Sequence, residues 1–140
     1  MARPYRMPHE ISELTSDPYE DFVKKVAEFK PDLLALSATE DMFPLGVKLI
    51  KALGEERPPS ICGGVFATFA PELALGYPEI DYVCKGEGEQ TLLEICKQLQ
   101  NDKPDISSVP NLCYASEDGT EISKTSMVDM NANPLIDMSI

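Results

Sequence analysis

Between residues 31 and 97, short apolar runs alternate with stretches of helical spacing, and this alternation restricts the fold more than any other feature of the sequence. The apolar runs are only a few residues long, as in strands that are buried on both faces of a sheet. Strands joined by helices run parallel, because each helix returns the chain to the edge where it started. The predicted strands cover residues 32–37, 60–62 and 80–84, and the predicted helices cover 43–53, 69–75 and 89–100. The sequence therefore predicts an α/β fold with helices on both faces of a parallel sheet.

The regions on either side of this core follow other patterns. Residues 18–30 have helical spacing, and Asp17 stands where it can cap the first turn. The stretch His9–Leu14 fits the end of a short strand. Two strand-like runs, 111–115 and 120–124, are separated by a turn signal, so we expect a C-terminal β-hairpin.

Length and charge exclude several classes of function. A chain of 140 residues with 43% apolar residues is the size of one domain. The formal net charge of −12 argues against binding the phosphate backbone of nucleic acid. The sequence contains neither an apolar run of about 18 residues nor a secretory signal, so we expect no membrane insertion and a cytoplasmic location.

Residues that commonly bind metals or act as nucleophiles are scattered along the chain. Cys62, Cys84, Cys96 and Cys113 stand singly in apolar surroundings, and we interpret them as small buried hydrophobic residues. The single histidine, His9, lies in the irregular N-terminal region and is interpreted as a solvated residue. The sequence therefore predicts no metal site and no catalytic residue.

Three loops follow the predicted strands, and in an open parallel sheet ligands bind beyond the carboxyl ends of the strands. Glycines and small hydroxyl residues in these loops would leave room for a ligand or hydrogen-bond it. Each loop also has a purely structural reading, as a helix cap or a tight turn. Because all three loops lie at one edge of the sheet, we expect a ligand site there. Its candidate residues are Ser37, Ala38 and Thr39, then Gly63, Gly64, Val65 and Thr68, then Gly86, Glu87, Gly88 and Glu89.

The loops lack the known phosphate-binding fingerprints. No G-x-G-x-x-G motif opens a helix, and no Walker motif is present. Gly86-Glu87-Gly88 matches only the first three positions of the dinucleotide motif, and its acidic residue would repel a pyrophosphate. Nucleotide binding is not expected.

The order and spacing of three blocks of residues resemble a known family. The blocks are 30–34 with 37–39, 63–68 with 71–72, and 81–83 with 86–89 and Thr91. They are similar to the cobalamin-binding domain of cobalamin-dependent radical S-adenosylmethionine (SAM) enzymes, a group that includes anaerobic magnesium-protoporphyrin monomethyl ester cyclase-like proteins and many methyltransferases. The resemblance implies a flavodoxin-like (Rossmann-like) domain over residues 1–125, with residues 126–140 as a tail or linker towards a radical SAM barrel.

The resemblance also implies how the loops would hold cobalamin. Ser37 and Thr39 would line a pocket for the dimethylbenzimidazole tail, Gly63 and Gly64 would let the tail pass close to the backbone, and residues 86–89 would close the far side. A Gly64→Val substitution would then block the ligand. The cofactor would carry a methyl group or take part in radical chemistry, with the iron–sulfur cluster and SAM in the barrel. The chain alone would not be catalytic, and its parent would be a cyclase or methyltransferase of this type.

The sequence departs from the family pattern in two respects. Phe66 stands where the family often has histidine, and the Asp-x-His-x-x-Gly motif of mutase-type domains is absent, so cobalamin would have no histidine ligand from this chain. The family usually opens with an apolar strand and helix before the region equivalent to His9–Leu14, which implies an N-terminally truncated domain without its first strand. The 32–37 strand would then have an unpaired edge, covered by the N-terminal segment or by a second chain in a homo-oligomer.

Two other functions are compatible with the same fold. A ligand-free interaction or structural domain would keep the sheet without using its loops. A signalling receiver would need a phosphorylatable aspartate after a central strand, and the 32–37 strand ends instead in Ser37-Ala38-Thr39, although Lys85 after a later strand would suit a receiver.

Overall fold

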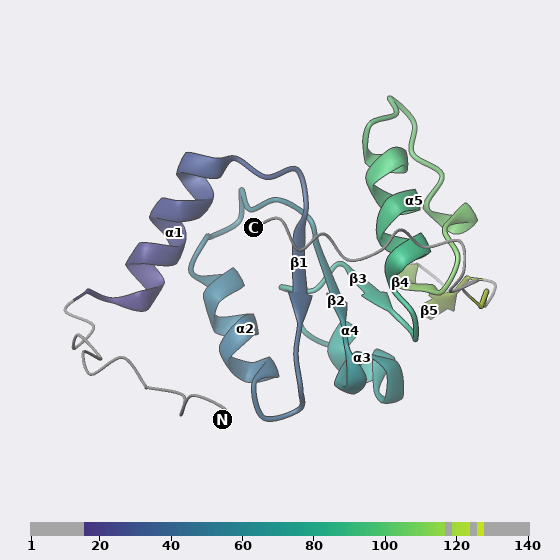
Figure 1. Ribbon diagram of the computed structural model, residues 1–140, viewed down its shortest axis with the longest axis horizontal. Helices are drawn as coiled ribbons and strands as arrows, with labels where there is room; N and C mark the ends of the chain where they lie inside the picture. The colour runs from purple at the N-terminus through teal and green to yellow at the C-terminus, as the bar shows by residue number, and fades with distance from the viewer. Residues whose placement is uncertain (1–15, 117–118, 124–125, 128–140) are drawn as a thin grey trace, which may run out of the picture.

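The computed structural model describes residues 16–116, 119–123 and 126–127, which form a five-stranded sheet covered by helices (Figure 1). The strands lie in the order β1-β2-β3-β4-β5. They are β1 (Leu34–Ser37), β2 (Ser60–Gly63), β3 (Tyr82–Cys84), β4 (Leu112–Ser116) and β5 (Gly119–Ile122). The first three pair in parallel, and β4 and β5 continue the sheet in antiparallel pairing. The predicted α/β sheet and hairpin are confirmed, and the hairpin joins the main sheet through β4, which the sequence did not predict.

Helices cover both faces of the sheet, as predicted. They are α1 (Pro18–Phe29), α2 (Phe43–Lys51), α3 (Val65–Phe69), α4 (Pro71–Leu75) and α5 (Glu89–Leu99), with a 3₁₀ turn at Ile106–Ser108. Cys62 of β2 faces the core formed with α2, α3 and α4, whereas its neighbour Ile61 faces the core formed with α5. Successive strand residues therefore point to opposite faces, and each face has its own apolar core.

The structure adds a helix that the sequence did not predict. The predicted helix over residues 69–75 corresponds to α4, which begins at Pro71, and α3 precedes it from Val65, directly after Gly64, in a region predicted as loop. Proline lacks the backbone N–H that would continue the hydrogen-bond ladder of α3, so α3 ends at Phe69 and α4 starts with Pro71 at its first position. His9–Leu14 and residues 128–140, also interpreted from sequence, lie outside the described residues.

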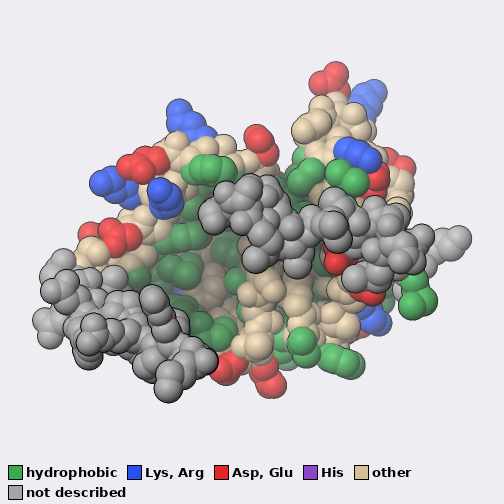
Figure 2. Space-filling model, in the orientation of Figure 1, with side chains coloured by type: hydrophobic (Ala, Val, Ile, Leu, Met, Phe, Trp, Pro, Cys, Tyr) green, Lys and Arg blue, Asp and Glu red, His purple; other side chains and the backbone are tan. Residues whose placement is uncertain are grey.

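The first helix is the least buried of the long ones. Asp17 caps it as predicted, accepting the backbone N–H of Tyr19 at 2.8 Å, and Lys30 ends it in a left-handed conformation. The helix packs against α2, but none of its residues is buried, and Phe29 is 77% exposed. Figure 2 shows charged side chains on its outer side and apolar side chains on the side towards α2. The apolar face of α1 is therefore only partly covered by the described residues. None of the described helices is long and apolar enough to cross a membrane.

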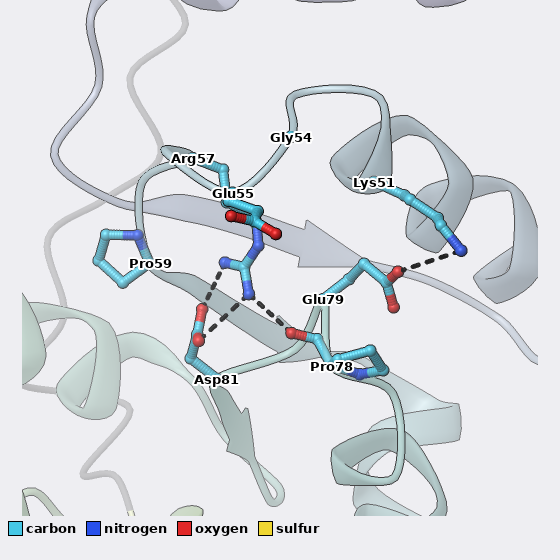
Figure 3. A pocket seen from close by; sticks show the side chains of 8 residues that line it. All are labelled: Lys51, Gly54, Glu55, Arg57, Pro59, Pro78, Glu79 and Asp81. Carbon is cyan, nitrogen blue, oxygen red and sulfur yellow. Dashed lines mark hydrogen bonds and ion pairs between the residues drawn. The ribbon is translucent and has the colours of Figure 1, made fainter.

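At the amino edge of the sheet, Arg57 joins the segments that lead into β2 and β3 (Figure 3). Its guanidinium donates to both carboxylate oxygens of Asp81, at 2.6 and 3.2 Å, and to the carbonyl oxygens of Pro58 and Pro78. The same carboxylate accepts the backbone N–H of Ser60 at 2.7 Å. The Arg57 side chain is 13% exposed and that of Asp81 is 36% exposed, so these charged hydrogen bonds are partly shielded from water and stabilise the sheet.

A cavity of about 770 Å³ opens beside this ion pair and contains a second pair of opposite charges, Lys51 and Glu79. The Lys51 Nζ atom lies 3.9 Å from the Glu79 carboxylate, but the lysine side chain is 76% exposed. The charged groups of the two ion pairs are therefore already partnered within the protein, and we assign this edge a structural role.

The two ion pairs predict different losses of stability. Arg57→Ala should lower the free energy of unfolding by about 2 kcal/mol, because it removes the charged partner of the Asp81 carboxylate and the side-chain donor of two carbonyl groups. Lys51→Ala is the matched control and should cost less than about 0.5 kcal/mol, because the lysine is 76% exposed and its Nζ atom lies 3.9 Å from the Glu79 carboxylate, beyond hydrogen-bond distance. Urea denaturation measures both values. Equal losses in the two variants would contradict the role given to Arg57.

Candidate functional site

The carboxyl ends of the three parallel strands meet at one edge of the sheet, as predicted, and a groove of about 340 Å³ opens there. The groove lies on the face that carries α5, since Ile61 and Cys84 belong to the core on that side. Its lining residues are Ala35, Leu36, Ser37, Ile61, Gly63, Gly64, Cys84, Gly86, Gly88, Glu89 and Leu92.

The floor of the groove is made of small residues. Ser37 pairs with Gly63 in the parallel register, and the register between β2 and β3 continues this row to Cys84. Gly63 has no side chain, and the side chains of Ser37 and Cys84 end one atom beyond Cβ. No bulky group therefore projects from the sheet along this row. The first turns of α5 form a wall, with Leu92 and Glu89 in the lining. The result is a narrow groove with mainly apolar walls, suited to a flat apolar group.

The glycines around the groove have two different roles. Gly64 and Gly86 have φ angles of +94° and +90°, which residues with a side chain rarely adopt. A Cβ atom on Gly64 would lie 3.0 Å from the carbonyl oxygen of Ala38, so it would clash with the protein itself. A Cβ atom on Gly63 would instead meet only Cβ of Cys84, at 3.9 Å, above the floor of the groove. Gly64 is therefore needed for the path of the backbone, so Gly64→Val would disturb the fold as well as the groove, whereas the lack of a side chain at Gly63 leaves space above the floor of the groove.

Six of the eleven predicted site residues line the groove. These are Ser37, Gly63, Gly64, Gly86, Gly88 and Glu89. The other five, Ala38, Thr39, Val65, Thr68 and Glu87, lie in the same loops but outside the lining. All three loops predicted from sequence thus contribute to one groove.

The residues outside the lining support the loops in several ways. Ala38 is buried and donates its N–H to the carbonyl oxygen of Gly63 at 3.4 Å, which joins the first loop to the second. The Val65 side chain is 66% exposed at the start of α3. The Glu87 carbonyl oxygen accepts a hydrogen bond from the Asn111 side chain at 3.5 Å. Ala38 and Glu87 therefore hold the loops in place without lining the groove.

Thr39 forms a turn of its own. Its hydroxyl donates to the carboxylate of Asp41, and this hydrogen bond lowers the pKa of Asp41 below its ordinary value. Its carbonyl oxygen, and not its side chain, accepts the N–H of Phe43 at the start of α2. Met42 occupies the cap position of that helix and makes no side-chain hydrogen bond there. The polar side chains of this loop therefore do not cap α2, contrary to the structural reading of the sequence.

Sequence reasoning missed the groove residues that belong to strands and helix. Ala35, Ile61, Cys84 and Leu92 form floor and wall, and the period-two alternation of the strands could have shown which of the first three share a face. Asn111 was also missed. It is buried, and its backbone carbonyl oxygen accepts the N–H of Lys85 at 2.8 Å. The two residues are 26 positions apart, so no local sequence signal could have shown this contact.

The thiol groups follow the sequence interpretation with one exception. Cys62, Cys84 and Cys113 are buried, whereas Cys96 is exposed on α5, so it is not a core residue. Burial raises the pKa of the Cys84 thiol, which keeps this part of the groove floor uncharged near neutral pH. Across the described residues, no group of three or more cysteine, histidine, aspartate or glutamate side chains could hold a metal ion.

Similar proteins of known name were found by comparing sequences. The chain is 27% identical over 119 residues to anaerobic magnesium-protoporphyrin IX monomethyl ester cyclase of Rubrivivax gelatinosus. The matched region covers 81% of this chain and 21% of the cyclase. The chain is also 31% identical over 101 residues to an uncharacterised methyltransferase of Pyrococcus horikoshii, and that matched region covers 69% of this chain and 21% of the methyltransferase. The chain therefore spans about a fifth of the length of these curated relatives.

Solved structures share the fold. The cobalamin-dependent SAM radical enzyme OxsB, with aqua-cobalamin and SAM bound, superposes with a TM-score of 0.70 at 22% identity, covering 81% of this chain and 16% of OxsB. The radical SAM methyltransferase TsrM from Kitasatospora setae, with cobalamin and a [4Fe-4S] cluster bound, gives a TM-score of 0.67 at 20% identity, covering 82% and 22%. At these identities the likeness establishes the Rossmann-like fold.

The family itself follows from a match that spans the site. The family model described as B12 binding domain matches residues 6–96, which include β1, β2, β3 and all three loops of the groove. The chain belongs to the B12 binding domain family.

Proposed function

We propose that the groove binds cobalamin by its dimethylbenzimidazole tail. The observation that carries this proposal is the row of small residues across three strand ends, Ser37, Gly63 and Cys84, beside the apolar wall at Leu92. A flat aromatic base needs a narrow apolar groove with few polar contacts, and these residues supply one. Ser37 and the backbone of the Gly86–Glu89 loop would provide the polar contacts at the mouth.

The described residues include no histidine that could bind the cobalt of cobalamin. His9 is the single histidine of the chain and lies outside them. At the position where the family often has histidine, the ring of Phe66 packs against the ring of Phe43, with centroids 4.6 Å apart. Phe66 therefore serves the core and leaves the cofactor without a ligand from this position.

We also propose that the chain is the cobalamin module of a radical SAM enzyme of the cyclase or methyltransferase type. The named relatives are about five times longer than the matching region, and the solved relatives hold SAM or a [4Fe-4S] cluster besides cobalamin. The bound cofactor would supply methyl transfer or radical chemistry. The residues of this chain would bind and orient it, and a separate barrel would hold the substrate, the cluster and SAM.

Binding should depend on the space above Gly63. The purified protein should retain roughly one equivalent of hydroxocobalamin through gel filtration, as its visible spectrum would record. Gly63→Val should weaken binding by at least about tenfold, because its methyl groups would fill a groove that must accept the base. The fold should be preserved, since valine suits a strand and a Cβ atom there makes only ordinary contact.

Ala115→Val is the control, because it places the same valine side chain at an exposed strand position away from the groove. It should bind cobalamin as the unmodified protein does. Complete loss of corrinoid from the unmodified protein at high micromolar concentration would favour the alternative of a ligand-free interaction domain. Binding unchanged by Gly63→Val would place the tail elsewhere.

A further proposal concerns the edge of the sheet at β1, which we infer pairs with a second copy of the chain. Among the described residues β1 has a partner on one side only, which is β2. The N–H groups of Leu34 and Ala38 point to the β2 side, so the backbone groups of Ala35 and Ser37 point outward. A hollow of about 600 Å³ beside the start of β1 has a mixed lining that includes Phe29, Leu33 and Leu99, and coverage of this edge would bury these three apolar side chains.

This pairing predicts the state of association. Light scattering at micromolar concentration should give a dimer, and Ala35→Pro should give a monomer of unchanged circular dichroism. Proline at 35 removes an outward N–H and leaves the bonds to β2 intact. A monomeric unmodified protein would instead favour coverage of the edge by the chain's own N-terminal segment.

A further inference from the structure

We infer that Thr68 is a positioning residue that fixes the distance between the two glycine loops of the groove. The inference rests on the proposed cobalamin site, but the contact itself belongs to the protein without ligand. Thr68 lies in α3 and is absent from the groove lining, so its side chain acts on the loops and not on a bound molecule.

The Thr68 hydroxyl bridges two segments that are far apart in sequence. Its Oγ1 atom donates to the carbonyl oxygen of Gly64 at 2.9 Å, one helical turn earlier. The same oxygen accepts the backbone N–H of Gly86 at 3.0 Å, and Gly86 lies 18 positions after Thr68 in the chain. One atom thus connects the loop after β2 with the loop after β3.

The direction of the two hydrogen bonds follows from the chemistry of a hydroxyl group. A hydroxyl has one proton and two lone pairs. The Gly64 carbonyl takes the proton, which leaves a lone pair for the Gly86 N–H and polarises the hydroxyl towards accepting it. Valine has nearly the same shape but can neither donate nor accept, whereas serine can do both.

Both ends of the bridge, Gly64 and Gly86, are glycines with positive φ angles. Gly86 would have open space around a Cβ atom, so packing does not hold this part of the loop. On its other side the loop is anchored by Asn111, whose carbonyl oxygen accepts the Lys85 N–H. The Thr68 hydroxyl is therefore the anchor on the α3 side, and without it the Gly86 end of the loop has one restraint fewer.

When a loop is already ordered in the protein without ligand, less conformational entropy is lost on binding. The bridge should therefore appear in two measurements. In the protein without ligand, the Gly86 amide should be protected from hydrogen exchange. In the binding reaction, the affinity for hydroxocobalamin should depend on the hydroxyl group at position 68.

The experiment compares Thr68→Val with Thr68→Ser in the full chain. Thr68→Val should speed exchange of the Gly86 amide by about tenfold and weaken hydroxocobalamin binding by about tenfold, the effect of losing one hydrogen bond. Thr68→Ser should stay within about threefold of the unmodified protein in both measurements, because it keeps the bridging oxygen.

Ser60→Ala controls for a general loss of stability. The Ser60 hydroxyl is buried at the opposite edge of the sheet and donates to the Glu79 carbonyl oxygen at 2.6 Å. Its loss should lower the urea midpoint while leaving hydroxocobalamin affinity within about twofold, because the groove is untouched.

Three results would overturn the inference. They are a Gly86 amide that stays protected in Thr68→Val, a serine variant as weak as the valine variant, or a loss of affinity in Ser60→Ala equal to that in Thr68→Val. If the unmodified protein bound no cobalamin at all, the proposed function would fail, and the exchange of the Gly86 amide would still decide the bridge.

Discussion

Parallel pairing of β1, β2 and β3 is the constraint on which the rest of the structure depends, because it brings three strand ends to a single edge. The register then decides what those ends present. Ser37, Gly63 and Cys84 fall in one row on the α5 face, and their small size leaves a groove where larger residues would complete a core. A shift of one residue in any of these strands would turn its side chains to the other face and close the groove.

The two edges of the sheet have different physical characters. At the amino edge, the Arg57–Asp81 pair joins neighbouring segments through charged, partly buried hydrogen bonds. At the carboxyl edge, the loops contain glycines at positive φ and are connected by single hydrogen bonds, such as the one from Gly86 to Thr68. Strong contacts at one edge allow the other edge to remain open for a ligand, in accord with the position of binding sites in open α/β sheets.

The fold could be predicted from the sequence because its signals are local. Apolar runs, helical spacing and the cap at Asp17 each involve a few neighbouring residues. The three loops were also identified correctly, but only six of their residues line the groove. The rest could not be assigned, because orientation depends on register and on contacts from distant positions. Thr68 was expected to contact the ligand, yet its hydroxyl is bonded to Gly64 and Gly86, and the role of Asn111 depends on a contact 26 positions away.

The central claim is that the groove at the strand ends receives the tail of cobalamin. Its most direct test is the titration of ¹⁵N-labelled protein with hydroxocobalamin and, in parallel, with cobinamide, which lacks the benzimidazole tail. The account predicts that hydroxocobalamin shifts the amide signals of Ser37, Gly63, Gly86 and Gly88, that cobinamide leaves them near their original positions, and that Gly54 at the amino edge is unmoved by either. Equal shifts with both corrinoids, or shifts confined to residues outside the groove, would contradict it.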